Sequence, residues 1–437
     1  MPVDSDAAPP VGPARSASRR DAGGAVRAEP ASARETLAGS PDVRRTNLSV
    51  LLRHLHLDGS MRRAELTDRL GLSRSTVAGL VGELVRLGAV QEAALGTGAG
   101  HPGRGRPSPV VRPQPLGVQV VAAEVRVDQV EVALVGLGGT VLHRDSRPLE
   151  DCEPEPTADL LADIVTGLVA RAPGRVLGLG VSVPGVIRRD DGAVRFAPNL
   201  RWRDVAFGRL VAARLPATGV RVVNDGDAGA LAEHLRGVAR GYDDVVFVEG
   251  EVGVGSGVIV GGTPLAGAGG YAGELGHIAV GGLRGRRCRC GSTGCWETEI
   301  GLDAIARALG LGVDAPRRAV VDALRATGAD GGARTDAGGE AGRDDRLDRV
   351  AHHLGAGLAT VVNVFNPHLI VLGGLLRELY PKVAGEVQRV MLAGALGAPA
   401  EQVRLALPGL GDDAVLLGAA EAVWQRVLLD PAGALAG

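Results

Sequence analysis

The spacing of apolar residues near the start of the chain predicts three short helices. The first carries an apolar stripe at the i, i+3, i+4, i+7 spacing of an amphipathic helix, and Asp58-Gly59 ends it. A second helix is predicted over residues 63–70, and Gly71 separates it from a third. The two stripes consist of Leu48, Leu51, Leu52 and Leu55, and of Val77, Leu80, Val81 and Leu84.

These helices, followed by the glycine- and arginine-rich segment 103–108, are typical of a winged helix-turn-helix domain. Ser73 can cap the third helix. The stripe of that helix faces the core, so its first residues face outward, where a recognition helix reaches base edges in the major groove. Arg74 can donate two hydrogen bonds to guanine or bind phosphate, and the wing arginines suit a narrow minor groove. The candidate DNA-binding residues are Ser73, Arg74, Ser75, Thr76, Arg104 and Arg106. The alternative is a helical protein-interaction module with a solvated basic face.

After about residue 117 the pattern changes to β-branched runs that alternate with helical segments, which is typical of α/β layers. The runs at 118–125 and 129–137 could form a hairpin. We therefore divide the chain into a disordered tail (1–44), a DNA-binding domain (45–113) and an α/β body (114–437). Within the body, the polar stretch at about 312–346 is predicted to be in part a mobile insertion.

Charge supports this division. The 437 residues carry 48 basic and 50 acidic side chains, a net charge of −2 that predicts no affinity of the whole chain for nucleic acid. Residues 44–113, however, contain eleven arginines and five acids. This segment is therefore basic and the remainder acidic. Only 2% of the residues are aromatic, which argues against a base-stacking platform for single strands.

The sequence predicts neither a membrane span nor a secretory signal. No apolar run reaches about 18 residues, and the first residues lack a basic start followed by an apolar segment. We expect a cytoplasmic protein that has no membrane partner.

Three of the four cysteines lie within eight residues, and a histidine precedes them. Soft thiolates with one imidazole favour tetrahedral Zn²⁺, and four protein ligands leave no open position, so the zinc would be structural. The glycine-rich loop 277–297 would fold around the ion. The alternative is a set of reduced thiols or a redox pair. The candidate ligands are His277, Cys288, Cys290 and Cys295.

Seven short motifs of the body occur in an order that closely resembles the ROK family (repressors, open reading frames, kinases). They are VSVPG (181–185), APNLRW (197–202), VND (223–225), GEVGVGSG (250–257), GELGH (273–277), CRCGSTGCWE (288–297) and NPHLIVLGG (366–374). The resemblance covers about residues 45–425, and the helix-turn-helix places the chain nearest to the repressor branch. It implies a two-lobed actin/hexokinase-like ATPase fold of class α/β, preceded by an all-α winged helix-turn-helix domain.

The resemblance also implies a sugar in the cleft between the lobes. Hydroxyls donate and accept hydrogen bonds, so carboxylates and amides can satisfy each of them. Zinc would organise the loop that carries Glu297, and His277 would serve both the metal and the cleft. In kinases of the family, the aspartate that matches Asp225 is the general base. The implied sugar contacts are Asn199, Asn224, Asp225, Glu274, His277 and Glu297.

The two phosphate-binding loops depart from the kinase pattern. The family's Asp-x-Gly-Gly-Thr loop is replaced by residues 123–128, which place bulky Val125 and Arg126 where backbone must approach phosphate. In the second loop the glycines remain, but Glu251 and Val252 stand where a hydroxyl residue is expected. We therefore predict a cleft that has lost, or largely lost, the use of ATP. Structural Zn²⁺ is the one cofactor that we expect.

The predicted protein is a sugar-responsive transcriptional regulator, a repressor of carbohydrate-metabolism genes. Its partners would be a double-stranded DNA operator, a sugar or sugar derivative, and further copies of the chain in a homodimer or homotetramer. One alternative is an ATP-dependent, glucokinase-like sugar kinase that carries a DNA-binding arm. Another is a DNA-binding protein whose body takes no ligand. The sequence predicts no catalytic residue, with Asp225 as the candidate if kinase activity persists.

Overall fold

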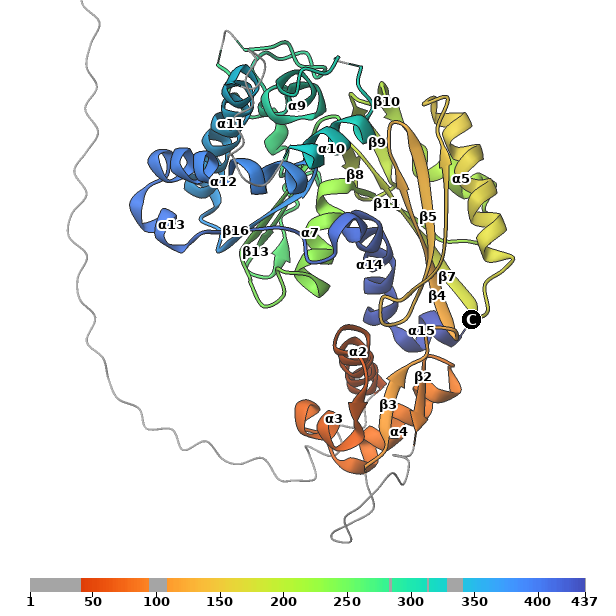
Figure 1. Cartoon of the computed structure of the whole chain (residues 1–437). Coiled ribbons are helices and arrows are strands. Elements are labelled where there is room, and N and C mark those ends of the chain that lie inside the picture. The colour runs from red at the N-terminus through yellow and green to blue at the C-terminus, as the bar shows by residue number, and fades with distance from the viewer. Residues whose placement is uncertain (1–40, 94–107, 283–284, 313, 328–340, 437) are drawn as a thin grey trace, which may run out of the picture. The chain divides into compact units, whose positions relative to one another are not determined.

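The computed structural model describes residues 41–93, 108–282, 285–312, 314–327 and 341–436, and residues 45–437 belong to one compact unit. Its N-terminal part contains the three predicted helices and a small antiparallel sheet in the order β1-β3-β2 (Figure 1). These elements are α2 (Pro41–Asp58), β1 (Met61–Arg62), α3 (Arg63–Leu70), α4 (Arg74–Arg86), β2 (Val90–Ala93) and β3 (Val110–Pro113).

Local sequence explains these helix ends. Gly71 adopts a left-handed conformation (φ 63°) that terminates α3. The Ser73 hydroxyl then accepts a hydrogen bond from the Thr76 amide at 3.1 Å and caps α4. All eight stripe leucines and valines are at most 1% exposed. The three predicted helices and their buried faces are therefore confirmed.

The body has two lobes. The first is built on a five-stranded mixed sheet in the order β11-β7-β4-β5-β6. Its central strand β4 is buried at all eight positions because helices cover both faces of the sheet. Val121, Ala123 and Val125 pack toward α5, while Val120 and Ala122 pack toward α14. The elements are β4 (Val118–Val125), β5 (Gln129–Gly136), β6 (Val141–Pro148), α5 (Pro154–Val169), β7 (Arg175–Val183), β11 (Val220–Asn224) and α14 (Ala414–Leu429).

A small antiparallel sheet and several short helices complete this lobe. They are β8 (Val186–Arg188), β9 (Ala193–Ala197), β10 (Trp202–Val205), α6 (Phe207–Arg214), η2 (Gly411–Asp413) and α15 (Pro431–Ala436). The predicted hairpin is present, because β4 and β5 pair antiparallel in register from Gln119–Gly136 to Val125–Val130.

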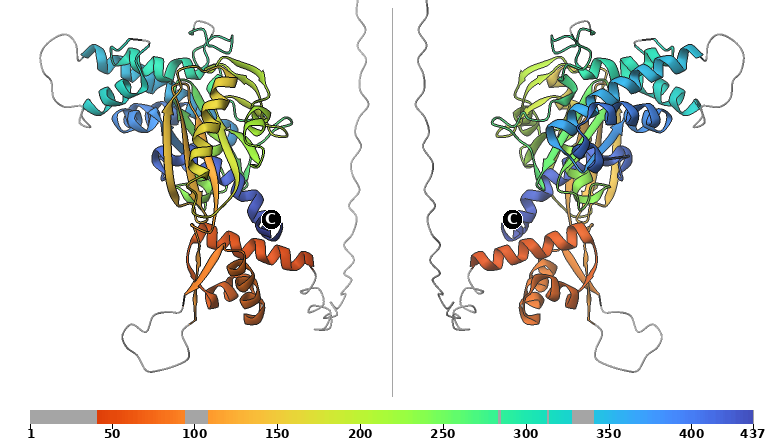
Figure 2. Two further views of the ribbon diagram at one scale, coloured as in Figure 1. Left: turned by 90° about the vertical axis from the view of Figure 1, so that its right-hand side faces the viewer. Right: turned by 90° about the vertical axis from the view of Figure 1, so that its left-hand side faces the viewer.

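The second lobe contains a five-stranded sheet in the order β14-β13-β12-β15-β16. The long helices α11 and α12 pack against each other over this lobe (Figure 2). Its strands are β12 (Val245–Gly250), β13 (Val254–Val260), β14 (Thr263–Pro264), β15 (Leu369–Gly374) and β16 (Arg404–Ala406). Its helices are η1 (Leu275–His277), α8 (Trp296–Ile300), α9 (Leu302–Ala308), α10 (Arg317–Ala326), α11 (Ala341–Phe365), α12 (Leu375–Gly394) and α13 (Gly397–Gln402).

Helix α7 (Asp225–Arg236) contacts both lobes. It packs against β7 and β11 of the first sheet, against β12 and β13 of the second, and most extensively against α14. The contact between the two helices is close because Gly418 of α14 has no side chain. A Cβ at that position would lie 1.9 Å from the carbonyl oxygen of Ala228. A shift of α7 is therefore expected to move α14 with it.

Three structural features differ from what the sequence predicts. Helix α2 begins at Pro41, and the DNA-binding domain is not all-α, because β1, β2 and β3 form a sheet. The segment 312–346 includes α10 and the beginning of α11, so part of the predicted insertion is helical. The tail up to residue 40, and the wing arginines Arg104 and Arg106, lie outside the described residues. Within the described part of the chain, no helix is long and apolar enough to cross a membrane.

Candidate functional site

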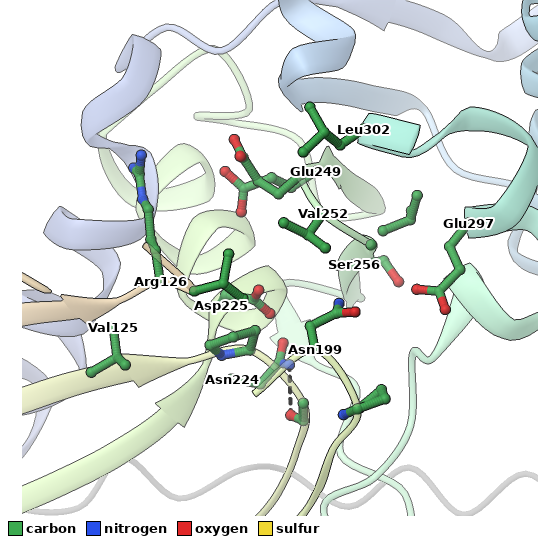
Figure 3. A pocket seen from close by; sticks show the side chains of 18 of the residues that line it. Val125, Arg126, Asn199, Asn224, Asp225, Glu249, Val252, Ser256, Glu297 and Leu302 are labelled. Carbon is green, nitrogen blue, oxygen red and sulfur yellow. Dashed lines mark hydrogen bonds between the residues drawn. The ribbon is translucent and has the colours of Figure 1, made fainter. Parts of the chain in front are cut away.

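A cavity of about 220 Å³ is lined by residues from both lobes (Figure 3). The first lobe contributes the turn after β4, the loop after β9 and the junction of β11 with α7. The second contributes the turn between β12 and β13, the η1 segment and the beginnings of α8 and α10. All six residues expected to contact sugar line this one cavity: Asn199, Asn224, Asp225, Glu274, His277 and Glu297. That they bind sugar remains a prediction.

The beginning of α7 fixes two of these side chains. Asn224 caps the helix, since its Oδ1 accepts a hydrogen bond from the Asp227 amide at 3.0 Å, and its Nδ2 donates to the Gly185 carbonyl at 2.9 Å. Asp225 follows, and its Oδ1 accepts from the Gly226 amide at 2.8 Å. Burial, together with nearby Glu274 and Glu124, raises the pKa of Asp225 to about 7. This carboxyl can therefore exist in either protonation state near neutral pH.

The second lobe presents the other acids. Burial, with the nearby carboxylates of Asp227 and Glu297, raises the pKa of Glu274 to about 7. Gly253 leaves the space in which Glu297 and Asn199 approach each other. A Cβ there would lie 2.5 Å from Glu297 Oε2 and 2.7 Å from Asn199 Nδ2. This part of the cavity is thus a ring of carboxylates and amides, which suits a ligand rich in hydroxyl groups.

The part of the cavity formed by residues 123–128 and 250–257, the two loops that depart from the kinase pattern, contains charged side chains. Arg126 Nε donates to Glu124 at 2.6 Å, and Arg317 Nε donates to Glu251 at 2.8 Å. Glu249 lies among them. Its burial, and the proximity of Glu251 and Glu124, raise its pKa well above the usual range. The two arginines are already paired with carboxylates, so they are not free to neutralise phosphate groups.

Sequence reasoning identified Glu124, Arg126 and Glu251 only as departures from a pattern. It missed Glu249 and Arg317 as lining residues. The motif at 250–257 could have indicated Glu249, which directly precedes it at the end of β12. Arg317 begins α10, inside the segment that was predicted to be a mobile insertion, and no signal in the sequence places it at the cavity.

The four candidate metal ligands come together. Each offers one ligand atom within 4.8 Å of the others. The Sγ atoms of Cys290 and Cys295 are 3.7 Å apart, and Cys288 Sγ is 3.8 Å from His277 Nδ1. Ligand atoms around a tetrahedral zinc ion are separated by about 3.5–3.8 Å. The donor set therefore fits an ion of this kind, and the cluster could hold a metal such as zinc.

The cluster is directly connected to the cavity. Cys295 is the residue before α8, and Glu297 is the second residue of that helix. The Cys288 thiol donates a hydrogen bond to Glu297 Oε1 at 2.7 Å, and His277 Nδ1 lies 3.7 Å from the same oxygen. An ion held here would fix His277 as a ligand, and it would fix Glu297 through Cys295, two residues before it. The hydrogen bond from Cys288 to Glu297 belongs to the protonated thiol and would be absent from a metal-bound thiolate.

The predicted DNA-reading residues lie at the exposed beginning of α4. Ser73, Arg74, Ser75 and Thr76 are all exposed, while Val77 directly after them is buried. The first turn of the helix is therefore free to enter a groove, as the sequence predicted. Its role in DNA binding remains a prediction.

A buried charge cluster links this domain to the body. The sequence shows no partner pattern for its histidine and indicates only a structural role. His56 of α2 lies against Glu421 of α14, with His56 Nε2 3.1 Å from Glu421 Oε2. Arg236, the last residue of α7, donates to the same carboxylate and to the Gly138 carbonyl. The Gly138 amide donates to His56 Nδ1 at 3.1 Å, and the Arg236 guanidinium also approaches His56 Nε2. One cluster therefore joins α2, α7 and α14.

Apolar packing continues across the same junction. Leu48, Leu52 and Leu55 of α2 belong to one hydrophobic core with Trp424 and Leu428 of α14. The Ser49 hydroxyl donates to the Leu428 carbonyl at 2.5 Å. The DNA-binding domain thus shares a continuous core with the first lobe.

Comparison with known proteins agrees with this architecture. Residues 120–426 match the ROK family, and residues 50–94 match the IclR helix-turn-helix domain. The chain belongs to the ROK family, carries a match to a helix-turn-helix domain ahead of the family's body, and has the two-lobed hexokinase-like fold.

Among its relatives, the xylose repressor of Bacillus subtilis is 28% identical over 395 residues, which cover 90% of this chain and 98% of that protein. The glucokinase of Streptomyces coelicolor is 30% identical over 311 residues, which cover 69% of this chain and 96% of the enzyme. A crystal structure of a ROK family transcriptional regulator, a homologue of the Escherichia coli Mlc protein, has a TM-score of 0.71. It is 24% identical and covers 90% of this chain and all of that chain. The repressors therefore match the DNA-binding domain and the body, whereas this kinase matches over 69% of the chain.

Proposed function

We propose that this protein is a sugar-responsive repressor of carbohydrate-metabolism genes that binds operator DNA through α4. The main observation that supports the proposal is that one cavity consists of two chemically different parts. Asn199, Asn224, Asp225, Glu274, His277 and Glu297 surround one part with hydrogen-bonding groups. The other part is filled by carboxylates and arginines that are already paired with one another.

Sugar recognition is proposed to rest on those six side chains. Asp225 and Glu274, whose pKa values are raised to about 7, can accept or donate hydrogen bonds to hydroxyls near neutral pH. Zn²⁺ in the cluster of His277 and the three cysteines would be structural, because four protein ligands leave no open coordination position. It would hold the loop that carries Glu297.

The same cavity is poorly suited to ATP. Glu124, Glu249 and Glu251 stand where phosphate groups would have to approach, and the arginines that could neutralise phosphate are already paired with Glu124 and Glu251. The proposed protein therefore performs no phosphoryl transfer, and no residue is assigned a catalytic role. Asp225 is placed as a general base would be in a related kinase, but we assign it to ligand binding.

The proposed coupling to DNA runs through α7. This helix begins at Asp225 in the cavity and ends at Arg236, which holds Glu421 beside His56 of the DNA-binding domain. A sugar that favours one position of α7 would therefore change how firmly α2 is held. The change in DNA affinity can be no larger than the difference in sugar affinity between the two states.

Further features of the proposal concern the assembled protein. A homodimer or homotetramer would place two α4 helices on a near-palindromic operator, about one helical turn of DNA apart. We place the protein in the cytoplasm, where an operator is accessible. The wing residues Arg104 and Arg106 are proposed to contact the minor groove beside each α4.

The test begins with selection of bound duplexes from a random library by the full-length protein. Fluorescence anisotropy then measures the affinity for the selected operator with each sugar of a broad panel. At least one sugar is expected to weaken binding by roughly 10- to 100-fold, which corresponds to about 1.4–2.8 kcal/mol of coupling. Asp225→Asn should retain the operator affinity and lose the sugar response. Identical affinities with every sugar would contradict the proposal.

The rival function, a sugar kinase with a DNA-binding arm, is tested on the same preparation. The intact Asp225 is the observation that favours it. Sugar-dependent ADP formation above about 1 s⁻¹, the lower limit that is usual for kinases, would replace our proposal with this one.

A further inference from the structure

A second cavity of about 220 Å³ lies beside the first turn of α7. It shares one lining residue, Asn224, with the cleft described above. Its walls come from β11, from the segment after β8, from the β14 turn and from α14. It is therefore a separate cavity with walls from both lobes, next to the helix that we propose responds to sugar.

Arg221 of β11 lines this cavity without a counter-charge. Its Nε atom is buried and has no hydrogen-bond partner within the described part of the chain. Burial lowers the pKa of the guanidinium, and the nearby positive charges of Arg426 and Arg189 lower it further. Among the described residues, no carboxylate lies within ion-pair distance of Arg221. The side chain is thus a cation held in a cavity with two other cations nearby.

The single carboxylate of the wall does not balance these charges. Asp227 Oδ2 lies 3.8 Å from Arg189 Nη2, at the outer limit of an ion pair. Burial raises the pKa of Asp227 to about 6, so part of its charge is lost in mildly acidic solution. Thr263 and Gln425 add a hydroxyl and an amide to the lining. The wall therefore combines a net positive charge with neutral hydrogen-bonding groups.

Arg221 is half-buried, and its buried Nε is in an unfavourable position, because this atom has given up hydration without gaining a hydrogen bond. The planar fork of donors matches the oxygens of a carboxylate or phosphate, which can satisfy two N–H groups at once. We propose that this cavity binds a small anionic ligand through an oxyanion group, a phosphate ester or a carboxylate, with Arg221 as the primary contact and Arg189 as the second.

The place of the cavity gives such a ligand access to the DNA-binding domain. Gly418, Ala422 and Gln425 of its wall lie on α14, the helix that carries Glu421. Asp227 and Leu231 lie on α7, which carries Arg236. An anion bound here would contact the two helices whose side chains hold His56. This site would act alongside the sugar cleft and does not depend on it.

The test uses full-length wild-type protein, thermal unfolding and isothermal calorimetry, with inorganic phosphate and acetate as probes. Both are titrated at constant ionic strength against chloride, so that nonspecific screening is the same throughout. We expect a saturable rise in melting temperature with at least one probe, because a ligand that binds only the folded state stabilises it. A response to phosphate alone identifies a phosphate ester, and a response to acetate alone identifies a carboxylate.

Two variants and a control make the result specific. Arg221→Gln is expected to weaken binding at least tenfold, and Arg189→Gln is expected to weaken it less. Arg209→Gln should bind like the wild type, since this arginine of the same lobe is 74% exposed and pairs with Asp191. Absence of a saturable response to either probe, or an unchanged response in Arg221→Gln, would overturn the proposal.

The stability of the Arg221→Gln variant without any probe is a further readout. It is expected to melt no lower than the wild type, because the substitution removes a half-buried charge whose buried Nε has no partner among the described residues. A clearly lower melting temperature would mean that the guanidinium already has a partner in the protein, and it would overturn the proposal.

Discussion

Replacing Glu421 by glutamine is expected to loosen the DNA-binding domain from the body. The Glu421 side chain is 2% exposed and holds two partners, His56 of α2 and Arg236 of α7. Glutamine keeps the size of the side chain but removes its charge and one of its two acceptor oxygens. The Arg236 guanidinium then remains at the junction without a counter-charge.

The expected magnitude follows from this geometry. Removing one partner of a buried ion pair costs about 3–5 kcal/mol. The remaining amide oxygen of glutamine can still accept one hydrogen bond, which places the effect near the lower end, at about 3 kcal/mol. A free energy of opening that is lower by this amount raises the equilibrium constant for opening of α2 by roughly 150-fold, since each 1.4 kcal/mol is a factor of ten.

Hydrogen exchange of the α2 amides measures this opening directly, because local opening determines their protection. A single unfolding midpoint would be less informative, since a chain with several parts need not unfold in one step. Glu386→Gln is the matched control, because this carboxylate pairs with Arg389 on the surface of α12 and should leave α2 unchanged. Protection of α2 that falls less than tenfold in Glu421→Gln would refute the reasoning.

Three further predictions concern pH, the metal cluster and DNA. Burial lowers the pKa of His56, whereas for Glu421 the charges and hydrogen bonds of His56 and Arg236 outweigh burial and lower its pKa. Both groups therefore bind fewer protons in the folded state. Their contribution to stability is complete above pH 6.5 and is lost on acidification. Protection of the α2 amides from hydrogen exchange should therefore fall below that pH. Protection that increases on acidification would contradict this prediction. Removing the metal by chelation, or Cys290→Ser, should lower the melting temperature and the sugar affinity together; well under one zinc per purified chain would count against the site. Arg74→Ala should abolish discrimination between the selected operator and a scrambled duplex, at a cost of about 1–3 kcal/mol, while Arg86→Ala at the other end of α4 keeps it. Unchanged specificity in Arg74→Ala would exclude this residue as the reader.

The local elements and the candidate residues were largely predictable because their signals are short-range. The stripe from Leu48 to Leu55 predicts one helix face, and Ser73 predicts a helix start, since capping depends on groups only three residues apart. The cysteine cluster was also predictable, because its four members lie within nineteen residues of one another in the sequence. The gathering of six sugar-site candidates around one cavity was expected from the order of the motifs and agrees with the structure.

The partners of individual charges were not predictable. His56 and Glu421 are 365 residues apart, and Arg236 lies far from both in the sequence. Arg317 falls in a segment whose composition suggested an insertion, yet it pairs with Glu251 in the cleft. Such pairs have no periodicity or motif, because they arise only when distant elements pack together.

The sequence by itself therefore determined the family resemblance, the three helices near the start of the chain, the hairpin of β4 and β5, and the set of side chains with suitable chemistry. Periodicity and capping are properties of neighbouring residues, and the order of motifs is a property of the linear sequence. All three can therefore be recognised without knowledge of the fold. Only the tertiary structure decided which charges are paired and which are not. It joins His56 to Glu421, and it leaves the Arg221 guanidinium in a cavity without a carboxylate partner among the described residues. The physical reason is that burial sets the strength of a charge interaction, and burial is determined by the packing of helices and sheets that are remote in the chain.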